Sequence, residues 1–393
     1  MSVIRLSFGQ TIAPLPPIVD RRQTASHFVW QKVVMLDDRQ NEPSIRDADN
    51  DSISALARKV AFLNRPESYT PVPDRIQTRE THMSWVFMNG ARVYKLKKPV
   101  RFPYLDFSTP ARRRMACLAE AALNRRLAPD VYLGVVPLTE TASGYAIDGP
   151  GPVADWLVVM RRLSEDETLD ARLRIGSARR TDAEQLAVVL ARFYSHAARI
   201  LIAPETYLAS LHEAAVLDWQ ILLNPRFDLP CGKILRIASV QKRFLKERAS
   251  MLIDRVSRRL IVDGHGDLRP EHLWLTPPHP IIDCLEFNAR LRASDALDEI
   301  AFLHLECERL GGRRFGDAIR QRLARVLHDA PASGVFLFYR LGRAMLRARL
   351  SIAHLFDAHP RTPEKWPRLA QTYLTLAASD AKRLERLLSG RSS

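Results

Sequence analysis

Two acidic residues stand in segments that would fix their positions in a folded chain. The segment HGDL at 265–268 contains Asp267, and the segment IIDCLEF at 281–287 contains Asp283. A loop followed by a tight hairpin would place both carboxylates on one side of a cleft. Phosphoryl transfer needs such a pair, because one carboxylate orients and deprotonates an attacking hydroxyl while another holds Mg²⁺ against phosphates. Asp267 is the candidate base, and Asp283 is the candidate metal ligand.

Upstream of these acids, the chain has the pattern of a mainly β lobe with one inserted helix. Asn89-Gly90, the strongest short-range hairpin signal, joins two short strands in SWVFMNGARVYKLKKP. A helix is expected over 118–127, ended by Pro129. Two further strands are expected in VYLGVVPL and ADWLVVM, separated by the turn-rich SGYAIDGPGP.

From Asp182 onward, the apolar residues repeat with helical spacing. Three long periodic segments cover 183–200, 207–224 and 240–260. One interruption, at 265–287, is expected to hold two short strands at 272–275 and 281–287 around the turn TPPHP. The predicted fold class is therefore α+β, with a small β-rich lobe followed by a large helical lobe.

The sequence pattern divides the chain into three regions. Residues 1–50, with a proline cluster and the polar stretch DDRQNEPSIRDADND, are expected to be disordered or extended. Order is expected to begin with a helix near Asp51 that Pro66 ends. The β-rich lobe then covers 51–162, and the helical lobe with the catalytic loop covers 163–393.

The composition narrows the classes of partner. The formal net charge is +15 and the sequence pI is about 10.0, but the arginines are spread over predicted helix faces without interleaved aromatic residues. This pattern indicates a solvated basic surface and argues against a nucleic-acid partner. Four well-separated cysteines predict neither a disulfide framework nor a zinc knuckle. The absence of a long apolar run or a secretory signal predicts a cytoplasmic protein without a membrane partner, and nothing in the sequence indicates an oligomeric state.

Several segments in order resemble a known superfamily. HGDL followed by an I-D strand resembles the catalytic loop and metal-binding segment of the aminoglycoside phosphotransferase and choline kinase superfamily. The wider set resembles one bacterial branch of uncharacterised proteins, whose kinase-like domain is often fused to a P-loop ATPase domain. The similarity covers about residues 51–350, and it rests on THMSWVFMNGARVYKLKKPVRFPYLDFST, RRRMACLAEAALNRRLAPDVYLGVVPL, HGDL, IDCLEFN and DEIAFL. The fused domain is not expected here, because no G-x-x-x-x-G-K-[ST] occurs.

This resemblance implies a bilobal protein-kinase-like fold and an ATP-dependent (or GTP-dependent) transfer of phosphate, with Mg²⁺, to a hydroxyl of a small molecule. It implies that Lys95 grips the nucleotide phosphates, although Lys97 lies on the same strand face two residues later and is a rival. Glu120 matches the helix acid that pairs with this lysine. Ser84 would bond a phosphate, and the linker around Met160 and Arg162 would offer backbone groups to adenine.

One position departs from the family pattern. Catalytic loops of this superfamily usually have asparagine five residues after the base, as a second magnesium ligand, and this chain has His272. Imidazole binds divalent metals, but Mg²⁺ prefers oxygen ligands. Two alternatives to a His272 ligand therefore stay open: Glu271 supplies the oxygen instead, or Asp283 and the phosphates hold Mg²⁺ alone. A catalytically weak or inactive kinase-like binding module is thus the competing hypothesis. His265 is expected to support the loop through a backbone carbonyl, and a metal site from His265, Asp267 and His272 is disfavoured.

The acceptor is predicted only as a class. Polycationic antibiotics need acidic pockets, and the chain is strongly basic. Aminoglycosides are therefore not the favoured acceptor. Asp295, Asp298 and Glu299 open a predicted helix, where negative charge suits the helix dipole; a capping role is expected for Asp295.

Overall fold

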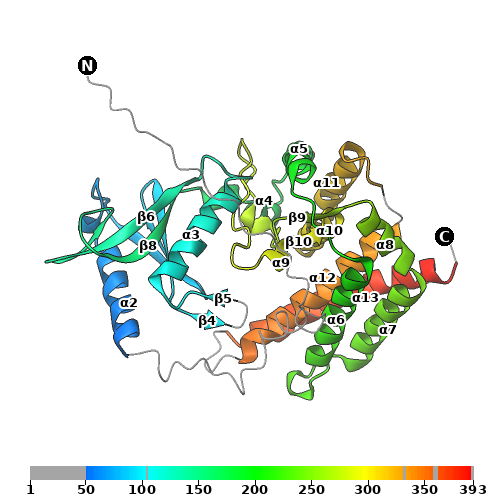
Figure 1. Cartoon of the computed structure of the whole chain (residues 1–393). Helices are drawn as coiled ribbons and strands as arrows, with labels where there is room; N and C mark the ends of the chain where they lie inside the picture. The colour runs from blue at the N-terminus through cyan, green and yellow to red at the C-terminus, as the bar shows by residue number, and fades with distance from the viewer. Residues whose placement is uncertain (1–49, 103–104, 331–332, 357–361, 391–393) are drawn as a thin grey trace.

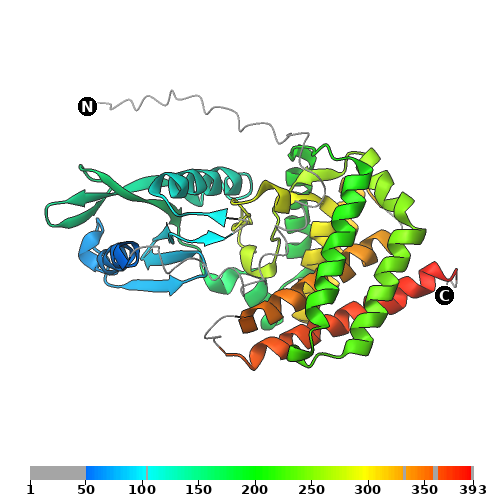
Figure 2. The ribbon, with the colours of Figure 1, turned by 60° about the horizontal axis from the view of Figure 1, so that its bottom comes forward.

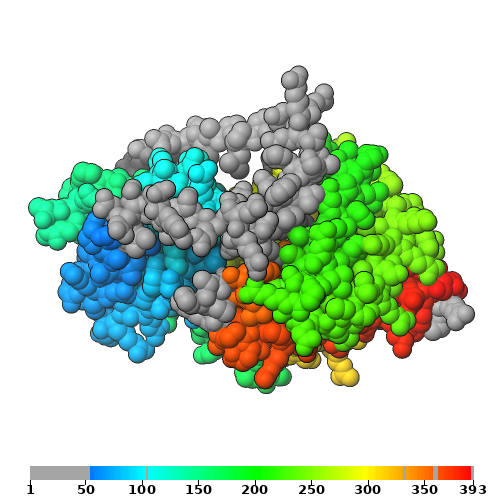
Figure 3. Space-filling model, turned by 90° about the horizontal axis from the view of Figure 1, so that it is seen from below, coloured from blue at the N-terminus to red at the C-terminus, as the bar shows by residue number. Residues whose placement is uncertain are grey.

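The computed structural model describes residues 50–102, 105–330, 333–356 and 362–390. These residues form two lobes, a small one built on a sheet and a larger one built from helices, as Figure 1 and Figure 2 show. In the space-filling view of Figure 3, the blue and cyan small lobe lies to one side of the green, orange and red helices. Of residues 1–50, which are predicted to be disordered or extended, 1–49 lie outside the described residues, and Asn50 begins α2.

The small lobe is a six-stranded antiparallel sheet with the order β1-β2-β3-β8-β6-β7. Asn89 pairs with Arg92 at the predicted hairpin, and Gly90 takes a positive φ of 50°, as a tight turn of this kind requires. The strands are β1 (Ile76–Glu80), β2 (Ser84–Asn89), β3 (Arg92–Lys97), β6 (Tyr132–Thr141), β7 (Gly144–Ile147) and β8 (Val153–Arg161), with a separate short pair β4 (Arg101–Phe102) and β5 (Leu105–Asp106).

Strand alternation sends neighbouring residues of the central strands to opposite faces of this sheet. Leu96 and Leu157 face α2 (Asn50–Leu63) and pack with Leu63. Val158, one residue later in β8, packs on the other face with Cys117 of α3 (Pro110–Asn124). Each face therefore has its own apolar core, and the odd-numbered residues of β3 lie on the α3 side.

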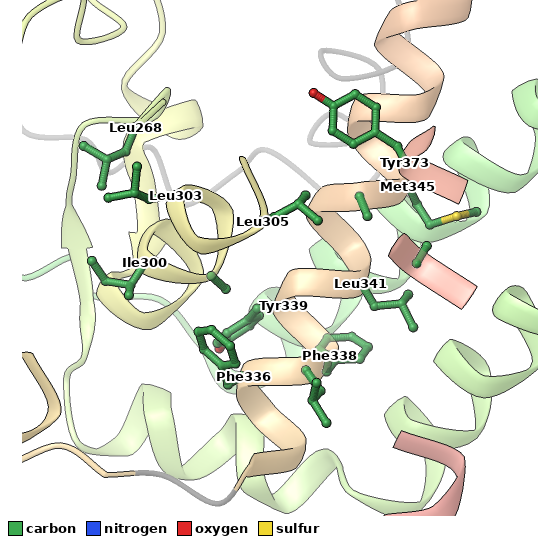
Figure 4. Packing of buried hydrophobic residues seen from close by; sticks show 14 of the residues in the cluster. Leu268, Ile300, Leu303, Leu305, Phe336, Phe338, Tyr339, Leu341, Met345 and Tyr373 are labelled. Atoms are coloured by element: carbon green, nitrogen blue, oxygen red, sulfur yellow. The ribbon is translucent and has the colours of Figure 1, made fainter. Parts of the chain in front are cut away.

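The helical lobe contains one large apolar core that joins nearly all of its helices. Figure 4 shows part of it, with Leu268 of the loop at 265–268, Ile300 and Leu303 of α10, and Phe338 and Leu341 of α12. The elements are α4 (Leu169–Arg174), α5 (Arg180–His196), α6 (Pro204–Leu222), α7 (Cys231–Glu247), α8 (Ala249–Ser257), α9 (Ala289–Arg292), α10 (Ala296–Arg309), α11 (Arg313–Val326), α12 (Ser333–Ala353) and α13 (Lys365–Leu388), with the paired strands β9 (Ile261–Asp263) and β10 (Ala293–Asp295).

Several predicted elements are confirmed and others differ. The hairpin, the strands at 131–138 and 154–160 and the helices from 182 onward are present. The helix expected over 118–127 is wrong in its bounds, because Thr109 caps a helix that begins at Pro110. The two strands expected at 272–275 and 281–287 are absent from the described structure, where only the single bridge Leu273–Ile281 joins these segments. The segment predicted at 240–260 is split at Arg248 into α7 and α8.

No helix in the described part of the chain is both long and apolar enough to span a bilayer.

Candidate active site

A cavity of about 1050 Å³ lies between the two lobes. The small lobe contributes Ser84 and Lys95 to its wall, and the helical lobe contributes Asp267, His272 and Asp283. Five of the predicted site residues, from segments up to 199 positions apart, therefore face one space. Met160 and Arg162 of the predicted adenine-binding linker also line it.

The loop that carries Asp267 is fixed on both sides of this residue. Gly266 has a φ of +87°, a conformation that L side chains rarely adopt, and an added Cβ would lie 2.9 Å from the Leu285 side chain. Leu268 is fully buried in the core of the helical lobe. The Asp267 side chain, between these two positions, keeps 23% of its surface exposed to the cleft. The backbone thus leaves the carboxylate accessible while holding the loop that bears it.

His265 supports this loop from inside the protein. The ring is fully buried; its Nε2 lies 2.9 Å from the Ile282 carbonyl oxygen, and its Nδ1 accepts from the Asp267 N–H at 3.3 Å. Burial, assisted by the nearby His272 ring, lowers the pKa of His265 to about 4. The predicted bond to a backbone carbonyl is present, and it ties the loop of Asp267 to the residue before Asp283.

Glu299 of α10 holds the same loop, a role that its position near a predicted helix start does not indicate. Its carboxylate accepts from the backbone N–H groups of His265 and Gly266 and from the Tyr194 hydroxyl. Burial raises the pKa of Glu299, and the two backbone hydrogen bonds oppose that rise. The expected capping role belongs to Asp295, whose side chain accepts from the Leu297 N–H at 2.9 Å.

Two lysines of β3 share one helix acid, because residues two apart on a strand face the same way. Lys95 Nζ lies 2.9 Å from Glu120 Oε1, and Lys97 Nζ lies 2.6 Å from Glu120 Oε2. Lys97 is 1% exposed and also pairs with Glu286 at 2.5 Å. Lys95 lines the cavity and lies 3.3 Å from Asp283 Oδ1. The geometry thus separates the rivals: Lys97 is enclosed by two carboxylates, and Lys95 faces the cleft.

The opposite charges of Glu120 and the two lysines keep these buried side chains ionised. Burial would raise the pKa of Glu120, but the two ammonium groups outweigh burial and hold its pKa below the ordinary value. Burial would likewise lower the pKa of Lys95, yet Glu120 and Asp283 keep it well above the ordinary value. Glu120 and Lys95 are therefore both charged near neutral pH, and the cleft presents a fixed ammonium beside a fixed carboxylate.

Asp283 is the second acid of the cleft, and about half of its side chain is exposed there. The residue takes a positive φ of 64°, which turns its carboxylate between Lys95 and His272. Enclosure by the remaining protein would raise its pKa, but the Lys95 ammonium, the largest opposing contribution, holds the pKa of Asp283 well below its ordinary value. A permanently ionised carboxylate at the edge of a cleft is a suitable ligand for a hard cation.

The donor set of the cleft fits a divalent cation shared with a ligand. Asp283 offers an oxygen, and His272 Nε2 lies 3.5 Å from Asp283 Oδ2. Among the described residues, no group of three or more histidines, cysteines and acids could hold a metal alone. A cation bound here would need further oxygens, which the phosphates of a nucleotide would supply. Both ring nitrogens of His265 contact backbone groups, which argues against a metal site that includes this residue.

The small-lobe wall is apolar, with polar groups near its rim. Val86, Val93 and Met160 line this part of the cavity, and the Ser84 backbone is fixed to Thr81. The linker differs from its expected role in one respect. The Arg162 N–H bonds the Ala91 carbonyl at 2.7 Å, so this donor is not available to an adenine ring.

Comparisons with known proteins support the fold more than a specific activity. No family model matches the chain. The chain is 31% identical over 295 residues to the uncharacterised proteins Mb2027c of Mycobacterium bovis and Rv2004c of Mycobacterium tuberculosis, an alignment that covers 74% of this chain and 58% of each relative. The chain therefore spans less than two thirds of the length of these curated relatives.

Among solved structures, a choline/ethanolamine kinase family protein from Mesorhizobium loti matches with a TM-score of 0.50 and 12% identity, over 85% of this chain and 99% of that one. A choline kinase from Cryptosporidium parvum matches with a TM-score of 0.47 and 11% identity, over 86% and 97% of the two chains. The chain has the α+β, choline kinase-like fold: an antiparallel sheet followed by a mostly helical region. The predicted fold class is confirmed.

Proposed function

We propose that this chain is an ATP-dependent or GTP-dependent phosphotransferase of the aminoglycoside phosphotransferase type, which transfers the γ-phosphate to a hydroxyl of a small molecule. The observation that carries this proposal is the position of Lys95 Nζ, 2.9 Å from Glu120 and 3.3 Å from Asp283, in the cleft that Asp267 also lines. A cation for phosphates, an ionised metal ligand and a candidate base thus share one site, as phosphoryl transfer requires.

Each residue has a defined part in the proposed reaction. The Asp267 carboxylate accepts the proton of the acceptor hydroxyl as its oxygen bonds to the γ-phosphorus and the bond to the nucleoside diphosphate breaks. Lys95 neutralises phosphate charge, and Glu120 holds the ammonium in place. A divalent cation held by Asp283 would neutralise further phosphate charge when bound. Val86, Val93 and Met160 exclude water around the nucleobase.

The charges on the helical side of the cleft bear on the acceptor. Asp218 of α6 pairs with Arg349 at 2.6 Å, and Asp298 of α10 pairs with Arg343 at 2.8 Å, both arginines coming from α12. These two wall carboxylates are already neutralised, so a polycation would have to displace arginines to reach them. This supports a neutral or anionic hydroxyl compound as the acceptor, in preference to an aminoglycoside.

A second function has its own support. The Asp267 carboxylate pairs with Arg269 at 3.0 Å, and His272 replaces the amide expected after the base. A base held in an ion pair would have to exchange that partner for a hydroxyl before it could act. These features favour the alternative of a kinase-like module that binds a nucleotide without turnover.

Thermal unfolding with nucleotide tests the site that both functions need. A ligand at one hundred times its Kd stabilises by about 2.7 kcal/mol, which should raise the melting temperature by roughly 5 °C. The proposal expects this rise with ATP or GTP plus Mg²⁺ or Mn²⁺, and its loss in Asp283→Ala. No rise with either nucleotide at millimolar concentration, in a folded protein, would overturn the nucleotide site.

A further inference from the structure

The orientation of His272 is fixed by a contact that the reaction described above does not use. The ring is 10% exposed, and its Nδ1 lies 2.9 Å from the Asp267 backbone carbonyl oxygen. A carbonyl accepts only, so Nδ1 carries the hydrogen. In the neutral ring the other nitrogen, Nε2, then bears the lone pair. One backbone bond therefore selects both the tautomer and the direction of the free nitrogen.

This lone pair faces the carboxylate of Asp283. Nε2 lies 3.5 Å from Asp283 Oδ2, while Oδ1 of the same carboxylate lies 3.3 Å from Lys95 Nζ. Each carboxylate oxygen thus has its own neighbour, and Oδ2 and Nε2 face one another without a hydrogen between them in this tautomer. Arg269 Nη2 lies 3.4 Å from Nε2, which is long for a hydrogen bond.

The separation of the two donors suits a shared cation. Zn²⁺ bonds to imidazole nitrogen and to carboxylate oxygen are about 2.0–2.2 Å long, and Mg²⁺ bonds to oxygen are about 2.0–2.1 Å long. Two such donors, at angles of roughly 90–110° around one ion, lie about 3–3.5 Å apart. The observed 3.5 Å falls at the upper end of this range. A histidine whose other nitrogen is held by a backbone carbonyl is also the usual arrangement of a metal-binding imidazole.

We infer that His272 Nε2 and Asp283 Oδ2 bind the nucleotide-linked cation together, and that this nitrogen makes the site select Mn²⁺ over Mg²⁺. Mg²⁺ demands oxygen ligands in near-ideal octahedral geometry, and a fixed imidazole is a poor one. Mn²⁺ also favours oxygen ligands, but as a transition-metal ion it accepts one imidazole nitrogen among carboxylate and phosphate oxygens more readily than Mg²⁺ does. The inference rests on the proposed function, since phosphate oxygens must supply the remaining ligands.

The nitrogen ligand can be detected directly, without turnover. Mn²⁺ is bound to the full chain with a non-hydrolysable ATP analogue, and pulsed electron paramagnetic resonance records the nitrogen coupling to the ion. We expect directly bonded ¹⁴N in the wild type, changing to the ¹⁵N pattern when only histidine is labelled with ¹⁵N. The label separates histidine nitrogen from adenine nitrogen. Bound Mn²⁺ with no histidine coupling would overturn the inference and leave the proposed function intact.

His272→Asn is the matched variant, because an asparagine amide can bond a carbonyl with its NH₂ and present an oxygen to the metal. We expect this variant to lose the histidine coupling and to bind Mn²⁺ about tenfold more weakly relative to Mg²⁺. Persistent coupling would assign the nitrogen to another histidine, and an unchanged Mn²⁺ to Mg²⁺ ratio would refute the selectivity. Glu271→Gln tests the rival oxygen donor, and it should leave the coupling unchanged. If neither ion binds with nucleotide, the proposed function itself fails.

Discussion

Glu299→Gln offers a test of how the helical lobe holds the candidate base. Glu299 is 1% exposed and accepts three hydrogen bonds, from the Tyr194 hydroxyl and the backbone N–H groups of His265 and Gly266. Tyr194 and His265 both bond Oε2, at 3.0 Å, while Gly266 bonds Oε1. Glutamine fits the same space, but only one of its two terminal groups can accept.

The expected loss of stability follows from the number of hydrogen bonds that glutamine cannot accept. If the glutamine oxygen replaces Oε2, its NH₂ group faces the Gly266 N–H, and one hydrogen bond to a charged acceptor is lost. Such a loss costs about 1.5–3 kcal/mol of unfolding free energy. The loop of Asp267 would also shift, and a displacement near 1 Å can lower a rate by about 100-fold. The proposed phosphotransferase should hydrolyse ATP slowly when water takes the place of the acceptor. We therefore expect the rate of this hydrolysis to fall by about 10–100-fold in Glu299→Gln, with the affinity for nucleotide little changed.

Urea unfolding and ATP hydrolysis at saturating nucleotide measure the two effects. Asp380→Asn is the control: Asp380 is fully buried in α13 and accepts from Arg340 at 2.7 Å, and it does not line the cleft. The control should lose stability and keep its hydrolysis rate. If Glu299→Gln is destabilised as predicted but hydrolyses ATP at the wild-type rate, Glu299 does not position the loop.

Three further predictions concern the cleft. Lys95→Met should abolish the nucleotide-dependent rise in melting temperature with little loss of stability, because Glu120 keeps Lys97. Lys97→Met should cost about 3–5 kcal/mol, because it takes the ammonium away from the largely enclosed Glu286 carboxylate; equal stability losses would contradict this division. Asp283→Ala should make nucleotide affinity, measured by calorimetry, independent of the divalent cation, and a retained dependence would remove its role as a ligand. Because the pKa of His265 is lowered to about 4 in the folded protein, the unfolded chain binds the proton first as pH falls below 6.5. About 3 kcal/mol of stability should thus be lost between pH 6.5 and pH 4, and His265→Gln should have a flatter profile; parallel profiles would refute the assignment.

Local spacing was sufficient to predict the parts of the site that lie on short segments. Asn89-Gly90 marked the hairpin, and the two-residue period of its second strand placed Lys95 and Lys97 on one face. The sequence could not divide their roles, because burial of Lys97 depends on Glu286, almost 190 residues away. The motifs HGDL and IIDCLEF also predicted Asp267 and Asp283, and both residues line the cleft as expected.

The elements that sequence reasoning missed have weak local signals. Strand β1 reads IQTRE and is mostly exposed, and β7 contains a glycine and lies at the opposite edge of the sheet. Edge strands need little apolar alternation, so periodicity does not reveal them. From the sequence, Glu299 is only a favourable charge near a helix start, because its bonds to the loop of Asp267 arise only when α10 packs against that loop.

The most direct test of the central claim is ATP hydrolysis in H₂¹⁸O, with water in place of the unknown acceptor. Attack on the γ-phosphorus puts one ¹⁸O into inorganic phosphate and none into ADP. We predict this labelling for the wild type with Mn²⁺ or Mg²⁺, and a rate lower by about 100-fold for Asp267→Asn, which keeps the size of the side chain but cannot take the proton. Nucleotide binding with no labelled phosphate above background would contradict catalysis and favour the non-catalytic module. Equal rates of labelling in the two proteins would contradict the role of Asp267 as the base.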